Sequence, residues 1–108
     1  MAIDFNALFN QLKIAVVNLA KEKVKQFAAE AASDGTSLLH VMESDIEKYA
    51  EQLAENKITT DQFQILLTGD EDLIEMTALT EAGLAEAAAD EFKKEVFDTI
   101  INTVLSVI

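Results

Sequence analysis

Cysteine, proline, tryptophan and arginine are absent from this chain of 108 residues, and glycine occurs only at Gly35, Gly69 and Gly83. Without cysteine the chain has no disulfides, no thiolate metal sites and no cysteine nucleophile. Three scattered glycines do not form a glycine-rich phosphate-binding loop. The single histidine, His40, excludes a di-iron bundle site, which needs two Glu-x-x-His motifs. We therefore assign no catalytic, cofactor-binding or metal-binding residue, and we expect a protein that is not an enzyme.

Positive charge is also scarce, because 8 lysines face 20 acidic residues and the formal net charge is −12. Nucleic-acid binding depends on lysine and arginine contacts with phosphates, so we expect no nucleic-acid partner. Anionic membrane surfaces are disfavoured for the same electrostatic reason. The charge instead favours a cationic partner, and it keeps a chain that is 50% apolar in solution.

Long apolar runs are missing too. Asp4 occupies the place of a basic signal-peptide region, and Lys13 interrupts the first apolar stretch. The best candidate for a membrane span, residues 96–108, contains Asp98 and Asn102 and is too short for a bilayer core of about 30 Å. From these features we expect a soluble, cytoplasmic protein without a membrane span.

The pattern that is present is helical. Apolar residues recur every three or four positions with no sustained alternation, which predicts an all-α fold in one domain over residues 1–108. The spacing predicts a small bundle of about four helices. The first runs over 4–32, with Asp4 as its N-cap, and residues 33–35 end it, with Gly35 in the left-handed position. The second begins after Thr36 or Ser37 and ends near Asn56.

The predicted third helix is short, begins at a cap formed by Thr59 or Thr60, and stops at Gly69. The acidic residues 70–72 then favour the amino end of a fourth helix, where the helix dipole stabilises negative charge. We expect that helix to extend to the end of the chain. Gly83 lies inside it, within an alanine-rich stretch that is either straight and closely packed or kinked.

The end of the chain has an unusually wide apolar surface. On a helical wheel the apolar side chains from Phe92 to Ile108 cover an arc of about 220°, which is more than one small core is expected to cover. The first helix has further apolar residues outside its main stripe. We therefore predict self-association, as a homodimer or larger, that completes the bundle through the first and last helices. The predicted interface consists of Ile14, Val17, Phe97, Ile101, Val104, Leu105 and Ile108.

These features describe an acidic helical interaction or scaffold protein whose partner is a second copy, or another helical or cationic protein. An alternative is a binding module for an apolar ligand or an amphipathic partner helix, with a groove lined by Phe92, Phe97, Ile101 and Leu105. A third interpretation rests on Ser37 at a helix start in a small acidic helical protein. This feature resembles the phosphopantetheine serine of acyl carrier proteins, although the long loop that precedes that serine in carriers is absent.

Three charged features are expected to lie on the surface. His40 lies beside the apolar stripe of its helix. Lys23 falls on the apolar stripe of the first helix, where its aliphatic stem can cover the stripe while the ammonium group reaches water. Glutamates at positions 43, 47, 51 and 55 form a ladder that we interpret as a solvated face, with a weak divalent-cation site as the alternative.

Overall fold

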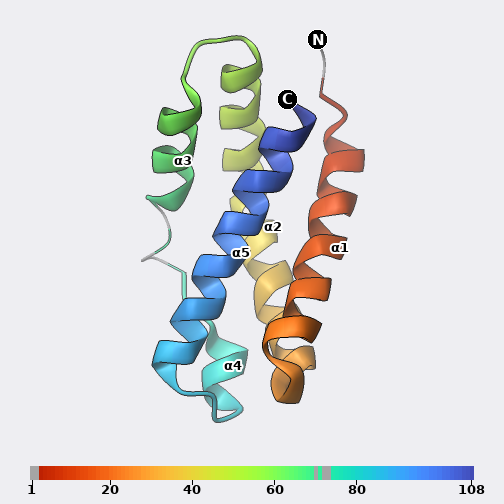
Figure 1. The fold of residues 1–108 in the computed structure, drawn as a ribbon, viewed down its shortest axis with the longest axis vertical. Helices are drawn as coiled ribbons and strands as arrows, with labels where there is room; N and C mark the ends of the chain where they lie inside the picture. Colours follow the sequence, from red (N-terminus) through yellow and green to blue (C-terminus); the bar gives the residue numbers. More distant parts are fainter. Residues whose placement is uncertain (1–2, 70, 72–73) are drawn as a thin grey trace.

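The computed structural model describes residues 3–69, 71 and 74–108. In these ranges the chain forms helices joined by loops and turns, and it contains no strand. The prediction of an all-α fold is thus confirmed. Figure 1 shows the helices. They are α1 (Phe5–Lys23), α2 (Ala28–Ala54), α3 (Thr60–Thr68), α4 (Thr77–Glu81) and α5 (Glu86–Val107), with a short 3-10 turn at Lys25–Phe27 between α1 and α2.

The bundle places α5 between α3 and α1, with α2 behind it (Figure 1). The short helix α4 lies at one end of the bundle, and the start of α1 and the end of α5 lie at the other. Each helix contributes to one contiguous apolar core. Its largest fully buried side chains are Phe63, Phe97, Leu12, Leu38, Met42, Ile46, Leu67, Leu79, Ile100, Val16, Val96 and Val104.

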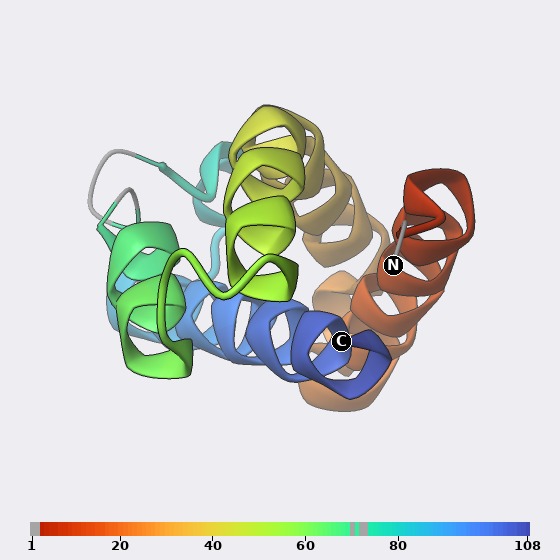
Figure 2. The same ribbon diagram turned by 90° about the horizontal axis from the view of Figure 1, so that it is seen from above.

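The helix α5 is buried over most of its girth by the helices of its own chain. It contacts α1, α2, α3 and α4, and the view from above shows α1 and α3 on its two sides (Figure 2). As a result Phe97, Ile101 and Val104 are only 1%, 5% and 0% exposed. For the part of the arc from Phe92 to Val104 the expectation that one chain could not cover it is wrong, because four helices of the chain surround it, whereas Val107 and Ile108 at its end remain exposed.

The turn between the first two helices lies earlier than the sequence predicted. The helix α1 ends at Lys23, and Val24 leaves the helical conformation with φ −131° and ψ 58°. The predicted stop at residues 33–35 is wrong, because these residues continue inside α2. Gly35 is buried there in helical backbone where α2 crosses α1, and a Cβ atom at this position would overlap a methyl group of Val16. The glycine thus allows a close helix contact rather than ending a helix.

The C-terminal end of α2 and the start of α3 agree with the sequence. Asn56 adopts φ 59°, and the amides of Asn56 and Lys57 donate to the carbonyls of Leu53 and Gln52, which is a Schellman motif. Thr59 caps α3 in a reciprocal capping box with Gln62. The helix then ends at Thr68, with Gly69 as its C-cap, as expected.

The prediction of one long helix through Gly83 is wrong. Gly83 has φ 108°, and it ends α4 in a second Schellman motif: its amide donates to Thr80 and the amide of Leu84 donates to Leu79. The chain then reverses direction and α5 begins at Glu86. The predicted acidic start of that helix, residues 70–72, falls largely outside the described residues.

The crossing of α1 and α2 can be tested by adding a single methyl group. We expect Gly35→Ala to lower the free energy of unfolding by about 1–3 kcal/mol, because the added group overlaps Val16. Urea denaturation measures the change. Combining it with Val16→Ala should cost less than the two single changes added together, because the overlapping methyl group is then removed.

The matched control is Gly69→Ala. Gly69 has helical backbone with φ −57°, and an added Cβ would lie 3.4 Å from its nearest neighbour, the carbonyl oxygen of Ile65. This variant should keep its stability or gain up to about 1 kcal/mol. Equal losses in the two alanine variants would show that the close contact with Val16 is not what constrains Gly35.

Candidate functional site

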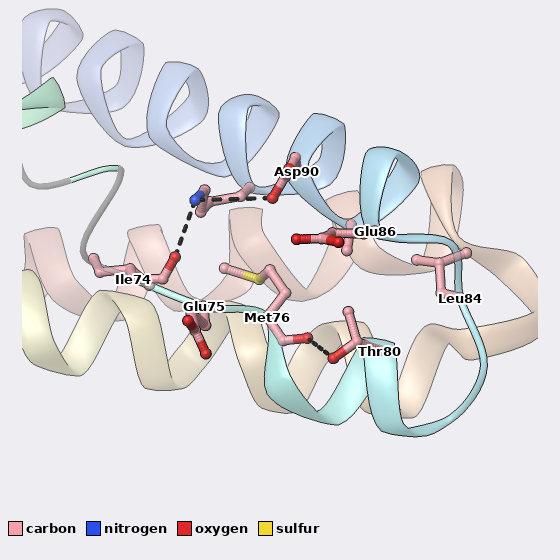
Figure 3. Close-up of a pocket in the computed structure, with 9 residues that line it drawn as sticks. Ile74, Glu75, Met76, Thr80, Leu84, Glu86 and Asp90 are labelled. Carbon is pink, nitrogen blue, oxygen red and sulfur yellow. Dashed lines mark hydrogen bonds and ion pairs between the residues drawn. The ribbon is translucent and has the colours of Figure 1, made fainter.

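A hollow of about 580 Å³ lies between the segment that precedes α4 and the first turns of α5 (Figure 3). Acidic residues line it on both sides: Glu75 comes from the segment before α4, and Glu86 and Asp90 come from α5. The Met76 side chain reaches from the same segment towards α5. The remaining lining residues are Ile74, Thr80, Leu84, Ala89 and Lys93.

Lys93 is the buried cation of this hollow. The residue is 8% exposed, its Nζ atom donates a hydrogen bond of 3.0 Å to the carbonyl of Ile74, and it lies 4.0 Å from Asp90. The hydrogen bond fastens the segment before α4 to α5 (Figure 3). Asp90 is the carboxylate that approaches the ammonium group, while Glu75 and Glu86 are exposed, so the hydrogen bond to Ile74 is the main contact that compensates the burial of this charge.

Lys93 was not singled out from the sequence, although a signal for it exists. On the helical wheel of α5 its angle falls between those of Ile100 and Val104, in the middle of the apolar arc. A lysine at such a position either extends its stem along the apolar surface to bring the ammonium group to water, or is buried with a polar partner. The lysine expected on an apolar stripe was instead Lys23, whose side chain is 52% exposed at the end of α1 and 3.9 Å from Glu95.

Asp34 is the buried anion of the described residues, and its role was also not predicted. It is 9% exposed, and its two carboxylate oxygens accept hydrogen bonds from the amides of Ala78 at 3.0 Å and Leu79 at 2.8 Å. These amides belong to the first turn of α4, so Asp34 on α2 caps a helix 44 residues further along the chain. Among the described residues, every buried side-chain nitrogen and oxygen has a hydrogen-bond partner.

The predicted surface groups lie on the surface. The side chain of His40 is 85% exposed, and its Nδ1 atom lies 3.4 Å from a carboxylate oxygen of Glu43. Of the glutamate ladder on α2, Glu47 and Glu51 are exposed and Glu43 is half-buried, and Glu55 lies exposed just beyond the helix. In the part of the chain that the structure describes, no group of three or more histidine and acidic side chains is placed to hold a metal ion.

The residues of the predicted interface divide into two groups. Phe97, Ile101 and Val104 belong to the core of the single chain, so their side chains are not available to a second copy. The remaining four reach or approach the surface. Ile14 and Ile108 are 62% and 43% exposed, and Val17 and Leu105 are half-buried.

A second hollow, of about 280 Å³, lies beside the start of α1 and the end of α5, and we call it the terminal hollow. Its lining is mainly apolar and also includes the end of α2. Val107 at its edge is 41% exposed. The lining residues are Ile3, Asp4, Ala7, Leu8, Gln11, Ala54, Val107 and Ile108. Of the predicted interface, Ile108 thus lies in this hollow, whereas Ile14 lies midway along α1.

Two alternative sites from the sequence do not form as expected. The groove of Phe92, Phe97, Ile101 and Leu105 is filled, because the first three side chains are core residues and Leu105 packs against that core. Ser37 is exposed in the middle of α2 and not at a helix start. The feature on which the resemblance to acyl carrier proteins rested is therefore absent.

Comparison of the chain with protein-family models, with curated proteins and with solved structures gave no match. In the described part of the chain, no helix combines the length and apolarity that crossing a bilayer requires.

The long-range cap of α4 gives a direct prediction for Asp34. We expect Asp34→Ala to lower the free energy of unfolding by about 2 kcal/mol, because the two amides of α4 lose their acceptor in a buried position. Asp34→Asn keeps one acceptor oxygen and should lose less. Ser33→Ala is the control, since Ser33 is the exposed neighbour on the same helix. Equal stability of the Asp34→Ala and Ser33→Ala variants in urea would contradict this role.

Proposed function

We propose that the protein is a non-enzymatic interaction protein that self-associates through α1 and the C-terminal end of α5. The observation that supports this proposal is the exposure of large apolar side chains on these two helices. Ile14 is 62% exposed, and Val107 and Ile108 are 41% and 43% exposed beside the terminal hollow. Val107 and Ile108 lie together with the apolar lining of the terminal hollow, and contiguous apolar surface is typical of contact sites between proteins.

The energetics favour covering this surface. Fully burying an isoleucine side chain contributes about 1.5–3 kcal/mol. Ile14 is 62% and Ile108 is 43% exposed, so covering them gains only part of this amount and offsets only part of the association cost, which is on the order of 4–15 kcal/mol. The opposing effect is the repulsion between two chains that each carry −12. A contact has to lie where the local charge is least negative, and α1 meets this condition with three lysines against one glutamate.

A second candidate function is the binding of a small apolar ligand in the terminal hollow. Its mainly apolar lining supports this candidate, and its volume of about 280 Å³ is close to the lower end of the roughly 300–1,000 Å³ that is typical of ligand pockets. In this case the ligand, and not a second copy, would cover Val107 and Ile108.

Sedimentation equilibrium at micromolar concentration tests the proposal. We expect the wild type to sediment above the 11.8 kDa of one chain, and Ile14→Asp to shift the population towards the monomer because it places a charge on the contact. Glu51→Gln, an exposed change on α2, should leave association unchanged. Ile101→Asp does not serve this test, because Ile101 is 5% exposed and a charge there would unfold the monomer.

A wild type that sediments as one 11.8 kDa chain at every concentration would contradict self-association. If native mass spectrometry of that monomer also showed a bound small apolar molecule, the second candidate would replace the first.

A further inference from the structure

The outward side of α1 differs from the rest of the protein surface. Ile14 lies at its centre. Residues that are three, four or seven positions from Ile14 in the sequence can lie on the same side of the helix. We call this set the α1 outer face: Asn10, Ile14, Val17, Asn18 and Lys21. Val17 is half-buried and the other four are exposed. None of the five is acidic, in a protein with 20 acidic residues.

The distribution of charge over the helices shows how unusual this face is. Of the five helices in the described part of the chain, α1 is the one with more lysines than acidic residues. It has three lysines against one glutamate, whereas α2 has six acidic residues against one lysine, and α5 has five against two. The α1 outer face is therefore where a second negatively charged protein can approach at least cost.

A second exposed apolar face lies on α3. Ile65 is 69% exposed and its neighbour Leu66 is 38% exposed, while Phe63 and Leu67 hold the opposite side of the helix in the core. Asp61 lies one turn before Ile65, and α3 contains no lysine. We call Asp61, Ile65 and Leu66 the α3 outer face. Like the α1 outer face, it has an apolar centre, but its charged residue, Asp61, is negative where Lys21 of the α1 outer face is positive.

These two faces point away from each other. In both views α1 and α3 lie on opposite sides of α5 (Figures 1 and 2). Each helix turns its buried residues inward, so the two outer faces lie on opposite sides of the molecule. One chain therefore cannot bring its own two faces together, but two copies can.

We propose that the α1 outer face of one copy docks on the α3 outer face of a second copy. This proposal rests on the proposed self-association and changes one part of it: the surface that α1 meets is the α3 outer face of the next copy, and not the end of α5. Because the two faces differ, the contact is head-to-tail. A chain of such copies keeps a free α1 outer face at one end and a free α3 outer face at the other. Such a contact closes into a ring or continues as a filament, whereas a two-fold contact stops at the dimer.

Complementation between two defective variants tests this geometry. Ile14→Asp removes the α1 face and keeps the α3 face, and Ile65→Asp does the reverse. Both side chains are largely exposed, so both variants should fold. We expect each variant alone to sediment as a monomer, and an equimolar mixture to form a dimer that grows no further. In that dimer the intact α1 face of one variant meets the intact α3 face of the other.

The charge part of the proposal has its own pair of variants. Lys21→Glu reverses a charge on the α1 outer face and should weaken association by about tenfold, as expected for the loss of one well-placed contact in an interface. Lys48→Glu makes the same change on an exposed residue of α2 and should have a much smaller effect. Equal weakening by the two variants would overturn the assignment of α1 as the docking helix.

The outcomes separate this proposal from the one on which it rests. If the wild type associates but the mixture of Ile14→Asp and Ile65→Asp stays monomeric, the head-to-tail contact is wrong and self-association stands. Unchanged association of Ile65→Asp alone leads to the same conclusion. If the wild type is monomeric at every concentration, both proposals fail.

Discussion

One turn of α2, around Asp34 and Gly35, holds the helices packed around it in place. Gly35 lets α1 approach so closely that a Cβ atom there would overlap Val16, and the same atom would lie 3.9 Å from the ring of Phe92 on α5. On the neighbouring residue, the Asp34 carboxylate binds the first amides of α4. Adjacent residues of one turn thus set how closely α1 approaches α2 and where α4 begins.

The buried charges act together at the end of the bundle that contains α4. Asp34 fixes the start of α4, and Lys93 holds the preceding segment to α5 through the carbonyl of Ile74. Gly83 then reverses the chain, so that α5 passes back through the centre of the bundle. Both charged groups satisfy backbone groups that would otherwise lack partners, which is a condition for burying charge in a small core.

The features that the sequence predicted well are those that depend on local signals. The N-cap of α3, expected at Thr59 or Thr60 and found at Thr59, and the end of α2 near Asn56 require only neighbouring residues. The predictions that were wrong concern residues whose role depends on contacts with residues far away in the sequence. Gly35 has the local signature of a helix stop, but its role is set by Val16 on another helix. Lys93 could have been found from the helical wheel, because it lies in the middle of an apolar arc, but its acceptor is 19 residues away.

The central claim is that the helices of one chain cover the apolar arc of α5 from Phe92 to Val104, so that any contact between copies uses other surfaces. Amide hydrogen exchange of residues 97–104 in the Ile14→Asp variant, diluted until it is monomeric, tests this most directly. We predict that in the monomer these amides exchange only when the whole chain unfolds, so that their exchange is slow and reports the global stability. Fast exchange that slows only when copies associate would show that a second chain is needed to cover α5, and would contradict this claim.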